Sequence, residues 1–310
     1  MFTEGICTMT FAVAYTGMPH APGWETGAHV IRSLRELGFD ALPYGTYYQS
    51  NEPIEHSISL QQMSGFDTLI VVDSGVFNDD YNQLADAEVE NRVYWLSDIE
   101  INPDPYLNYC SQMKFDAIFS TNMKWLPKLR EYSPIVHYLP YGIDPSRHRI
   151  MNDVEKDIEL GFVGSIGGGY TERTEFVEKV KEGGIEITTT SGHSGWDFIK
   201  ATNRFQNTLN LNVSFGDGLL NARTFEAPAC GSLLITNACE ELAQSYREEW
   251  EVLTYESPED VVKIMKRLRA HPNLQKNIAR VGYEATLERH TYKMRAQEML
   301  FQLSAKELQF

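Results

Sequence analysis

Short apolar runs alternate with amphipathic stretches along the whole chain. The first half contains MTFAVAYTG, FDTLIVVDSG, NRVYWLSD, FDAIFSTN and IVHYLPYG, and the second half contains DIELGFVGS, IEITTTSG, TLNLNV and SLLITN. Apolar runs of this kind, separated by helical patterns, are typical of a parallel sheet that helices cover on both faces. The pattern therefore predicts an α/β protein with two doubly wound, Rossmann-like lobes.

Two helices can be predicted from their ends. In GWETGAHVIRSLRELGF the apolar side chains fall at helical spacing, and Gly38 follows them as the residue that can adopt a left-handed conformation. In SPEDVVKIMKRLRAHP, Ser257 can cap the helix, Pro258 suits its first turn and Asp260 completes a capping box. Both segments are therefore expected to be amphipathic helices of the two lobes.

The length of 310 residues favours about two domains. The stretch YGIDPSRHRIMNDVEKD is polar and has no sustained period, so it is expected to connect the lobes. We place the boundary near residue 150, with one lobe over 1–150 and a second lobe with terminal helices over 151–310. Open α/β sheets bind ligands beyond the carboxyl ends of their strands, so the expected site is a cleft between the lobes.

The charge and the cysteines restrict the kind of protein. With 27 basic and 43 acidic residues the formal charge is -16, which disfavours non-specific binding of nucleic acids. The basic helix around Lys266 is expected to be a solvated face. Four cysteines without C-x-x-C spacing are typical of reduced thiols, no run is long enough to span a bilayer, and Glu4 interrupts the apolar start. A soluble, cytoplasmic protein is therefore expected.

The stretch LNARTFEAPACGSLLITN, residues 220–237, combines a helical pattern with two charges. A crossover helix here would place Arg223 in its first turns, where backbone N–H groups and the guanidinium favour phosphate. Glu226 lies three residues later on the same face and can accept both hydroxyls of a ribose. Pro228 and Gly231 predict a short helix with a sharp exit. The alternative is a surface Arg–Glu pair.

The loop GFVGSIGGGYTERTEF is rich in glycine, which allows a backbone to approach a phosphate closely. We expect donor contacts from Gly164, Ser165 and Arg173, and from Asn221 and Gly231 of the later stretch; a solvated arginine is the alternative for Arg173. The loop is not G-x-G-x-x-G, and the next strand ends in threonines instead of an acid. A dinucleotide-dependent dehydrogenase is therefore disfavoured.

Two residues of the first lobe are candidates for catalysis. His20, in the loop TGMPHAPGWETG, can accept a proton near neutral pH, although a lone loop histidine can also be structural. Asp98 and Glu100 in WLSDIEINPDP resemble the acidic pair that holds a divalent metal in GT-A glycosyltransferases. Two alternating halves argue against that fold, and we keep Asp98 as a candidate cleft residue.

The order of FDAIFSTN, HYLPYGID, DIELGFVGS…ER, TLNLNV, NARTFEAPACGSLLITN and RHTYKMRAQEML resembles group 1 glycosyltransferases of the GT-B fold, in particular the spore-maturation branch. The resemblance covers residues 90–300. It implies two lobes facing a central cleft, a C-terminal helix returning to the first lobe, and metal-independent transfer of a hexosyl or pentosyl group. It also implies that Glu226 binds the ribose and Arg223 the diphosphate of a nucleotide sugar, with a UDP-sugar as expected co-substrate and no other cofactor.

One position departs from the family pattern. Many group 1 enzymes carry a first glutamate seven residues before the second, and this chain has Gly218 there, next to Asp217. The stereochemistry therefore stays open. A non-catalytic sugar-nucleotide-binding or coat-assembly protein and a phage-type glycosyltransferase of modified DNA bases are alternatives. The acceptor (a glycan, a protein, a small molecule or a DNA base) and the oligomeric state are also open.

Overall fold

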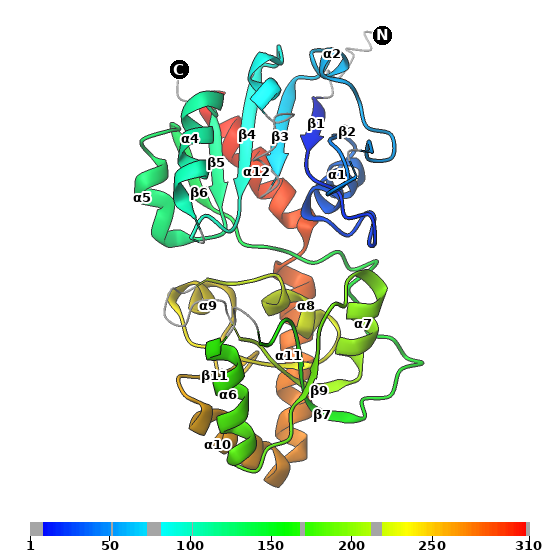
Figure 1. Cartoon of the computed structure of the whole chain (residues 1–310), viewed down its shortest axis with the longest axis vertical. Helices are drawn as coiled ribbons and strands as arrows, with labels where there is room; N and C mark the ends of the chain where they lie inside the picture. The colour runs from blue at the N-terminus through cyan, green and yellow to red at the C-terminus, as the bar shows by residue number, and fades with distance from the viewer. Residues whose placement is uncertain are drawn as a thin grey trace, which may run out of the picture. The chain divides into compact units, whose positions relative to one another are not determined.

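The structure is a computed structural model that describes residues 9–50, 52–72, 82–100, 102–167, 171–211 and 219–307. The chain divides into two compact units (Figure 1), of which unit 1 comprises Met1–Pro140 and Tyr292–Phe310, and unit 2 comprises Tyr141–Thr291. The chain thus passes from unit 1 to unit 2 after Pro140, before the boundary expected near residue 150, and its last helix belongs to unit 1. Each unit has one parallel sheet, which confirms the α/β class with two Rossmann-like lobes.

Unit 1 is built on a parallel sheet in the order β2-β1-β3-β4-β5-β6. The order reverses at β1, because β2 lies on one side of it and β3 on the other. The strands are β1 (Thr10–Ala14), β2 (Asp40–Tyr44), β3 (Thr68–Val72), β4 (Asn91–Leu96), β5 (Ala117–Ser120) and β6 (Ile135–Tyr138). The helices are α1 (Thr26–Glu36), α2 (Leu60–Met63), η1 (Gln83–Asp86), α4 (Pro103–Met113), η2 (Met123–Trp125), α5 (Leu126–Leu129) and α12 (Tyr292–Glu307).

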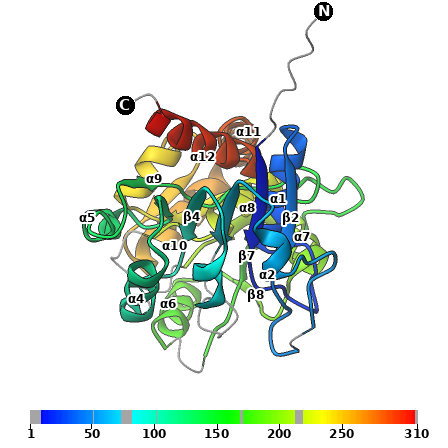
Figure 2. The same ribbon diagram turned by 90° about the horizontal axis from the view of Figure 1, so that it is seen from above.

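Helices cover both faces of this sheet. Successive residues of a strand point to opposite faces, so Ala12 packs on the side of α4, whereas Phe11 and Val13 pack on the side of α1 and α12. In Figure 2, α4 and α12 accordingly lie on opposite sides of the strands. The return of the C-terminal helix to the first lobe is therefore confirmed. Its buried apolar residues include Tyr292, Ala296, Met299 and Leu303.

Unit 2 contains a parallel sheet in the order β11-β10-β9-β7-β8, which reverses at β7. Its strands are β7 (Ile158–Val163), β8 (Thr188–Thr190), β9 (Phe205–Leu209), β10 (Leu233–Asn237) and β11 (Leu253–Tyr255). Its helices are α6 (Thr171–Glu182), α7 (Gly195–Asn203), α8 (Arg223–Ala229), α9 (Glu240–Ser245), α10 (Pro258–Ala270) and α11 (Pro272–Arg289). The apolar cluster on one face includes side chains of α6 and α10, the cluster on the other includes side chains of α8 and α9, and α11 contributes to both.

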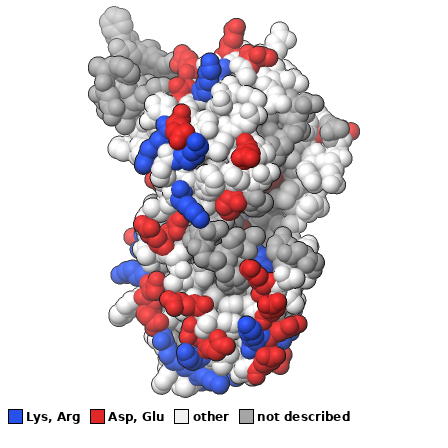
Figure 3. All heavy atoms as spheres, turned by 60° about the vertical axis from the view of Figure 1, so that its left-hand side comes forward, with Lys and Arg blue, Asp and Glu red and all other residues white. Residues whose placement is uncertain are grey.

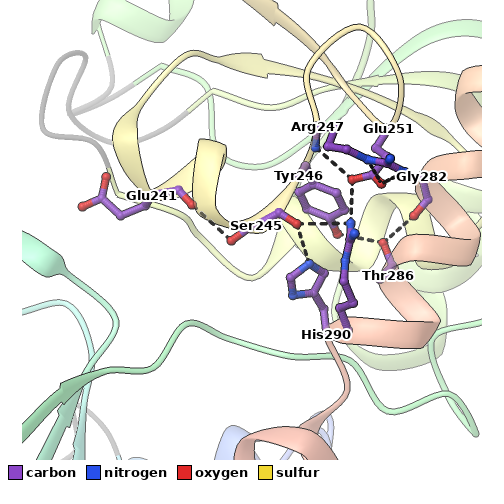
Figure 4. Close-up of polar contacts among 9 residues, drawn as sticks. Glu241, Ser245, Tyr246, Arg247, Glu251, Gly282, Thr286 and His290 are labelled. Carbon is purple, nitrogen blue, oxygen red and sulfur yellow. Dashed lines mark hydrogen bonds and ion pairs between the residues drawn. The ribbon is translucent and has the colours of Figure 1, made fainter.

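A polar network around the buried carboxylate of Glu251 holds α9 and the loop after it against α11 (Figure 4). The carboxylate of Glu251, 1% exposed, accepts the backbone N–H and the guanidinium N–H of Arg247 at 2.8 Å each. Arg289 donates to the same carboxylate at 2.6 Å, and the hydroxyls of Tyr246 and Thr286 lie 2.7 Å apart. Burial opposes ionisation of Glu251, but these donors outweigh it and lower the pKa of its carboxyl.

The described cysteines are free thiols, and Cys110 and Cys230 are buried. Burial raises the pKa of each of these two thiols to about 12, so both are inert at neutral pH. Over the parts of the chain that the structure describes, no helix has both the length and the apolar character needed to cross a membrane.

Candidate functional site

The sequence-predicted donor residues gather mainly at the carboxyl ends of β7 and β9, where the strand order of unit 2 reverses. Ligands of open α/β sheets bind at such a reversal, because the loops there diverge to opposite faces of the sheet. Gly164 directly follows β7, and α8 is the crossover helix between β9 and β10. As predicted, this helix is short and contains Pro228.

Arg223 begins α8 and reaches across to the end of β7. Its Nη1 donates a hydrogen bond to the carbonyl of Val163 at 2.5 Å, and its guanidinium lies 5.7 Å from the centroid of the Phe162 ring. A Cβ added to Gly164 would collide with the same guanidinium. The glycine therefore leaves the space in which Arg223 contacts β7, and the pair brings a cation to the carboxyl end of this strand.

Glu226 lies one helical turn after Arg223, with 20% of its side chain exposed. Its Oε1 is 3.4 Å from Nε2 of His148, whose side chain is 3% exposed. His148 was not among the residues predicted from the sequence, because it belongs to the segment interpreted as a connector. Nothing in the local pattern marks it, since its proximity to Glu226 arises only from the fold.

Asn221 anchors the start of α8 to the sheet. Its side-chain amide donates to Oδ1 of Asn210 at 3.0 Å, and Asn210 in turn donates to the hydroxyls of Thr224 and Thr236 at 3.3 and 3.2 Å. Asn210 follows β9 and is fully buried. Sequence reasoning missed Asn210, although a polar residue at the end of an apolar strand is a signal that could have identified it.

Arg173, on α6, donates a hydrogen bond to the glycine-rich loop that follows β7. It is only 4% exposed, and its Nη1 donates to the carbonyl of Ser165 at 3.3 Å, so it is not the solvated arginine of the alternative interpretation. The N–H of Gly167 donates to the hydroxyl of Thr174 at 3.0 Å. These bonds tie the loop after β7 to the first turn of α6. The predicted Gly168 and Gly169 lie outside the described residues.

Gly231 lies between the end of α8 and the start of β10. It is therefore at the amino ends of the parallel strands, whereas Gly164 is at their carboxyl ends. Its φ of +68° suits glycine, and a Cβ there would lie 2.9 Å from the side chain of Ile150. The sharp exit from the helix is therefore explained by this conformation, and the structure does not bring Gly231 to the other donor candidates. Asp217 and Gly218 lie outside the described residues.

In unit 1, His20 lies in an exposed turn after β1. The nearby Glu25 is 8% exposed, and its Oε1 accepts the N–H of Met18 at 2.5 Å, which ties the loop together. His20 and Glu25 thus lie near the carboxyl end of β1, where the strand order of unit 1 reverses. A ligand-binding loop is typical of this position.

Asp98 follows β4, is partly buried and has a φ of +55°, which is uncommon for a residue other than glycine. The neighbouring acid, Glu100, accepts a hydrogen bond from the amide of Asn122 at 3.3 Å. Among the residues that the structure describes, no three His, Cys, Asp or Glu side chains form a group that could hold a metal ion.

Two units with parallel sheets, each with a reversal of strand order, have the architecture of the GT-B fold, which the similar solved structures share. A profile of the glycosyl transferase-like family matches residues 147–301, half of the chain. The chain belongs to this family and is a glycosyltransferase. A search of curated proteins gave no match.

Three solved structures illustrate the likeness in fold. HepE from Anabaena, in complex with UDP and glucose, has 9% identity and a TM-score of 0.69, over 96% of this chain and 100% of that chain. The DNA-modifying enzyme β-glucosyltransferase, studied with and without uridine diphosphoglucose, has 13% identity and a TM-score of 0.64, over 96% and 99%. T4 phage BGT, with UDP and Mn²⁺, has 12% identity and a TM-score of 0.59, over 96% and 99%.

Proposed function

We propose that this glycosyltransferase moves a sugar from a UDP-sugar to an acceptor hydroxyl and that unit 2 binds the donor. The observation that carries the proposal is the arrangement of Arg223 and Glu226 one helical turn apart, with Arg223 against Gly164 at the end of β7. UDP is bound to HepE, and uridine diphosphoglucose is the substrate of the DNA-modifying enzyme, so a uridine donor is the first to test.

In this proposal Arg223 binds the diphosphate and Glu226 accepts hydrogen bonds from the ribose hydroxyls. During transfer the bond between the sugar and the diphosphate breaks, and negative charge grows on the departing phosphate. A fixed guanidinium stabilises that charge because the hydrogen bonds are charge-assisted. Gly164 and Ser165 would approach the phosphates with their backbone, while Arg173 and Asn221 support this loop and the start of α8. We assign Gly231 a structural role.

For the acceptor we propose unit 1. His20 is the candidate base, because an exposed imidazole after β1 can take the proton that the acceptor hydroxyl loses when its oxygen bonds to the sugar. Asp98, after β4, is a second candidate that can accept a hydrogen bond from the acceptor. The spore-maturation branch and a reducing, cytoplasmic location also belong to this proposal; the free thiols support the latter.

We also propose that transfer needs no divalent metal, because Arg223 can supply the positive charge near the diphosphate. The complex of T4 phage BGT with Mn²⁺ makes this a question for experiment. We expect the rate of transfer after dialysis against EDTA to equal that of untreated protein. Loss of activity that Mn²⁺ restores would contradict metal independence.

A modified DNA base is a second candidate acceptor, supported by the likeness to the DNA-modifying enzyme. The distribution of charged side chains argues against a DNA acceptor. On the face shown in Figure 3, acidic and basic side chains of the described residues are interspersed. On α10, Arg269 donates two hydrogen bonds to Glu159, at 2.6 and 2.7 Å, and Arg267 pairs with Glu249 at 2.6 Å. These arginines are neutralised within the protein, so they offer little to a polyanion.

The proposed donor site is tested with Glu226→Gln, which keeps the size of the side chain and removes its charge. Hydrogen bonds to charged groups contribute about 1.5–3 kcal/mol, so we expect calorimetry to show UDP binding ten- to a hundredfold weaker. Glu284→Gln, an exposed acid on α11 that pairs with Arg280, is the matched control and should bind UDP like the wild type. Unchanged affinity in Glu226→Gln would place the donor elsewhere.

A further inference from the structure

Glu226 is held by a buried histidine that lies far from it in sequence. His148 is 2% exposed, and its Nε2 lies 3.4 Å from Oε1 of Glu226. Glu226 keeps 20% of its side chain exposed, so a ligand can still reach the carboxylate. The histidine therefore contacts the carboxylate from the protein interior.

The surroundings of the other ring nitrogen determine which nitrogen of His148 carries the proton. The backbone N–H of Asp144 points at Nδ1 from 3.1 Å, and this hydrogen bond needs a lone pair on Nδ1. The Asp144 carbonyl, 3.3 Å from Nδ1, already accepts the N–H groups of Arg147 at 2.9 Å and His148 at 2.7 Å. In the neutral ring the proton is then on Nε2, which can donate it to Glu226.

The turn that presents His148 is itself constrained. Oδ1 of Asp144 accepts the N–H of Ser146 at 3.0 Å and its hydroxyl at 2.6 Å, and the next N–H groups return to the Asp144 carbonyl. Side chains whose rotamers are fixed by such bonds and by burial can position a neighbouring ligand group accurately. His148 therefore presents a fixed nitrogen to the carboxylate of Glu226.

We propose that His148 is a positioning residue for the donor: it fixes the carboxylate of Glu226 so that its exposed part faces the ribose hydroxyls. This inference rests on the proposed function, in which Glu226 binds the ribose. A glutamate loses rotamer entropy when a ligand orders it, and a hydrogen bond that orders it beforehand removes that cost from binding.

Two substitutions separate the role of Nε2 from the role of His148 in the fold. In His148→Asn the amide oxygen can replace Nδ1 as acceptor for Asp144, but the side chain is too short to reach Glu226. In His148→Gln the amide nitrogen can occupy the place of Nε2 and donate to Glu226. We therefore expect Asn to lose the positioning effect and Gln to keep most of it.

The readout is calorimetry with UDP and with 2′,3′-dideoxy-UDP, which lacks the hydroxyls that Glu226 would bind. We expect His148→Asn to bind UDP about tenfold more weakly than wild type and to bind the dideoxy ligand with unchanged affinity. We expect His148→Gln to bind UDP within about threefold of wild type. Circular dichroism and thermal unfolding of both variants check that unit 2 is intact.

The outcomes distinguish this inference from the proposed function. Equal weakening for both ligands would show that His148 only maintains the fold, and unchanged UDP affinity in His148→Asn would also overturn the inference. If Glu226→Gln discriminates between the two ligands while His148→Asn does not, only the role of His148 fails. If Glu226→Gln does not discriminate, or the wild type does not bind UDP, the proposed ribose contact fails and the inference with it.

Discussion

The contact between Gly164 and Arg223 shows how one missing side chain determines the place of another. Arg223 lies on a helix and Gly164 after a strand about sixty positions earlier, yet a Cβ on Gly164 would occupy the space of the guanidinium. The hydrogen bond to Val163 and the ring of Phe162 hold the guanidinium in that space. The glycine is therefore required for the position of the arginine, besides any freedom that it gives the loop.

We predict that Gly164→Ala weakens binding of UDP by displacing Arg223. Arg223→Ala should lower UDP affinity about tenfold or more and leave the affinity for uridine unchanged, because only the diphosphate contact is lost. If the alanine at 164 acts through Arg223, the double variant should bind UDP about as weakly as Arg223→Ala alone. Calorimetry of the three variants measures this non-additivity, and additive losses would mean that Gly164 acts on the ligand independently.

At this scale the sequence indicated the charged candidates but not the residues that contact them. Arg223 and Glu226 could be proposed because they share a helical face and a motif within four positions. His148 could not, because it meets Glu226 only after the chain has folded. Asn210 carried a signal, as a polar residue at the end of an apolar strand, but its hydrogen bond with Asn221 could not be read from that pattern. Contacts between residues far apart in sequence leave no local pattern in the chain.

Among the elements, α10 shows how strongly local chemistry can determine a helix start. The predicted capping box is confirmed: the Ser257 hydroxyl accepts the N–H of Asp260 at 3.2 Å, and the Asp260 carboxylate accepts the N–H of Ser257 at 3.1 Å. The amino group of Lys263 and then the Ser257 hydroxyl hold the pKa of Asp260 down to about 2. Lys263 and the capping residue Ser257 therefore both favour the ionised carboxylate of Asp260.

We predict that this cap stabilises the protein only where Asp260 is ionised. Because its pKa is lower in the folded state than the 3.8 of the free side chain, its contribution is complete above about pH 4 and is lost as the pH falls towards 2. In urea unfolding, Asp260→Asn should be less stable than wild type at pH 7, and the difference should shrink below pH 4. Ser257→Ala should cost about 1 kcal/mol at pH 7.

Glu259→Gln is the control for this prediction, since Glu259 is also in the first turn of α10 but is not part of the capping box. It should show little of the pH dependence of Asp260→Asn. A difference between Asp260→Asn and wild type that stays constant from pH 7 to pH 3 would contradict the assignment.

Whether a segment forms a helix or a strand was predictable where the hydrophobic period was strong. The length of a strand and the sheet that a helix covers were less predictable, because they depend on packing. The strand predicted from IEITTTSG is reduced to Thr188–Thr190, the last strand in the order of its sheet, and β7 is its neighbour there. The allocation of the last helix to unit 1 was expected from the family resemblance only. Its apolar stripe would have suited either sheet, and the choice depends on the complementary surface that α1 and the strands provide.

At the scale of the whole molecule, α12 completes the core of unit 1. We predict that Met299→Ala, at a site 2% exposed, lowers the free energy of unfolding of unit 1 by about 2–5 kcal/mol, because it leaves a cavity. Phe301→Ala on the same helix removes a larger side chain that is 68% exposed and should change stability by less than about 0.5 kcal/mol. Urea unfolding followed by circular dichroism measures both.

Neither substitution should alter the affinity for UDP, since the proposed donor residues lie in unit 2. Equal effects of Met299→Ala and Phe301→Ala on stability would mean that the buried stripe of α12 does not support unit 1.

The path of the chain has a consequence for biosynthesis. Unit 2 is one uninterrupted stretch, whereas unit 1 combines the first stretch with the last helix. At ribosomal rates, the roughly 150 residues of Tyr141–Thr291 take on the order of ten seconds to translate. During that time the nascent first lobe has a six-stranded sheet with the apolar surface for α12 uncovered, while the second lobe can already fold. The lobe that begins synthesis first can therefore complete its core only after the last helix of the chain has been made.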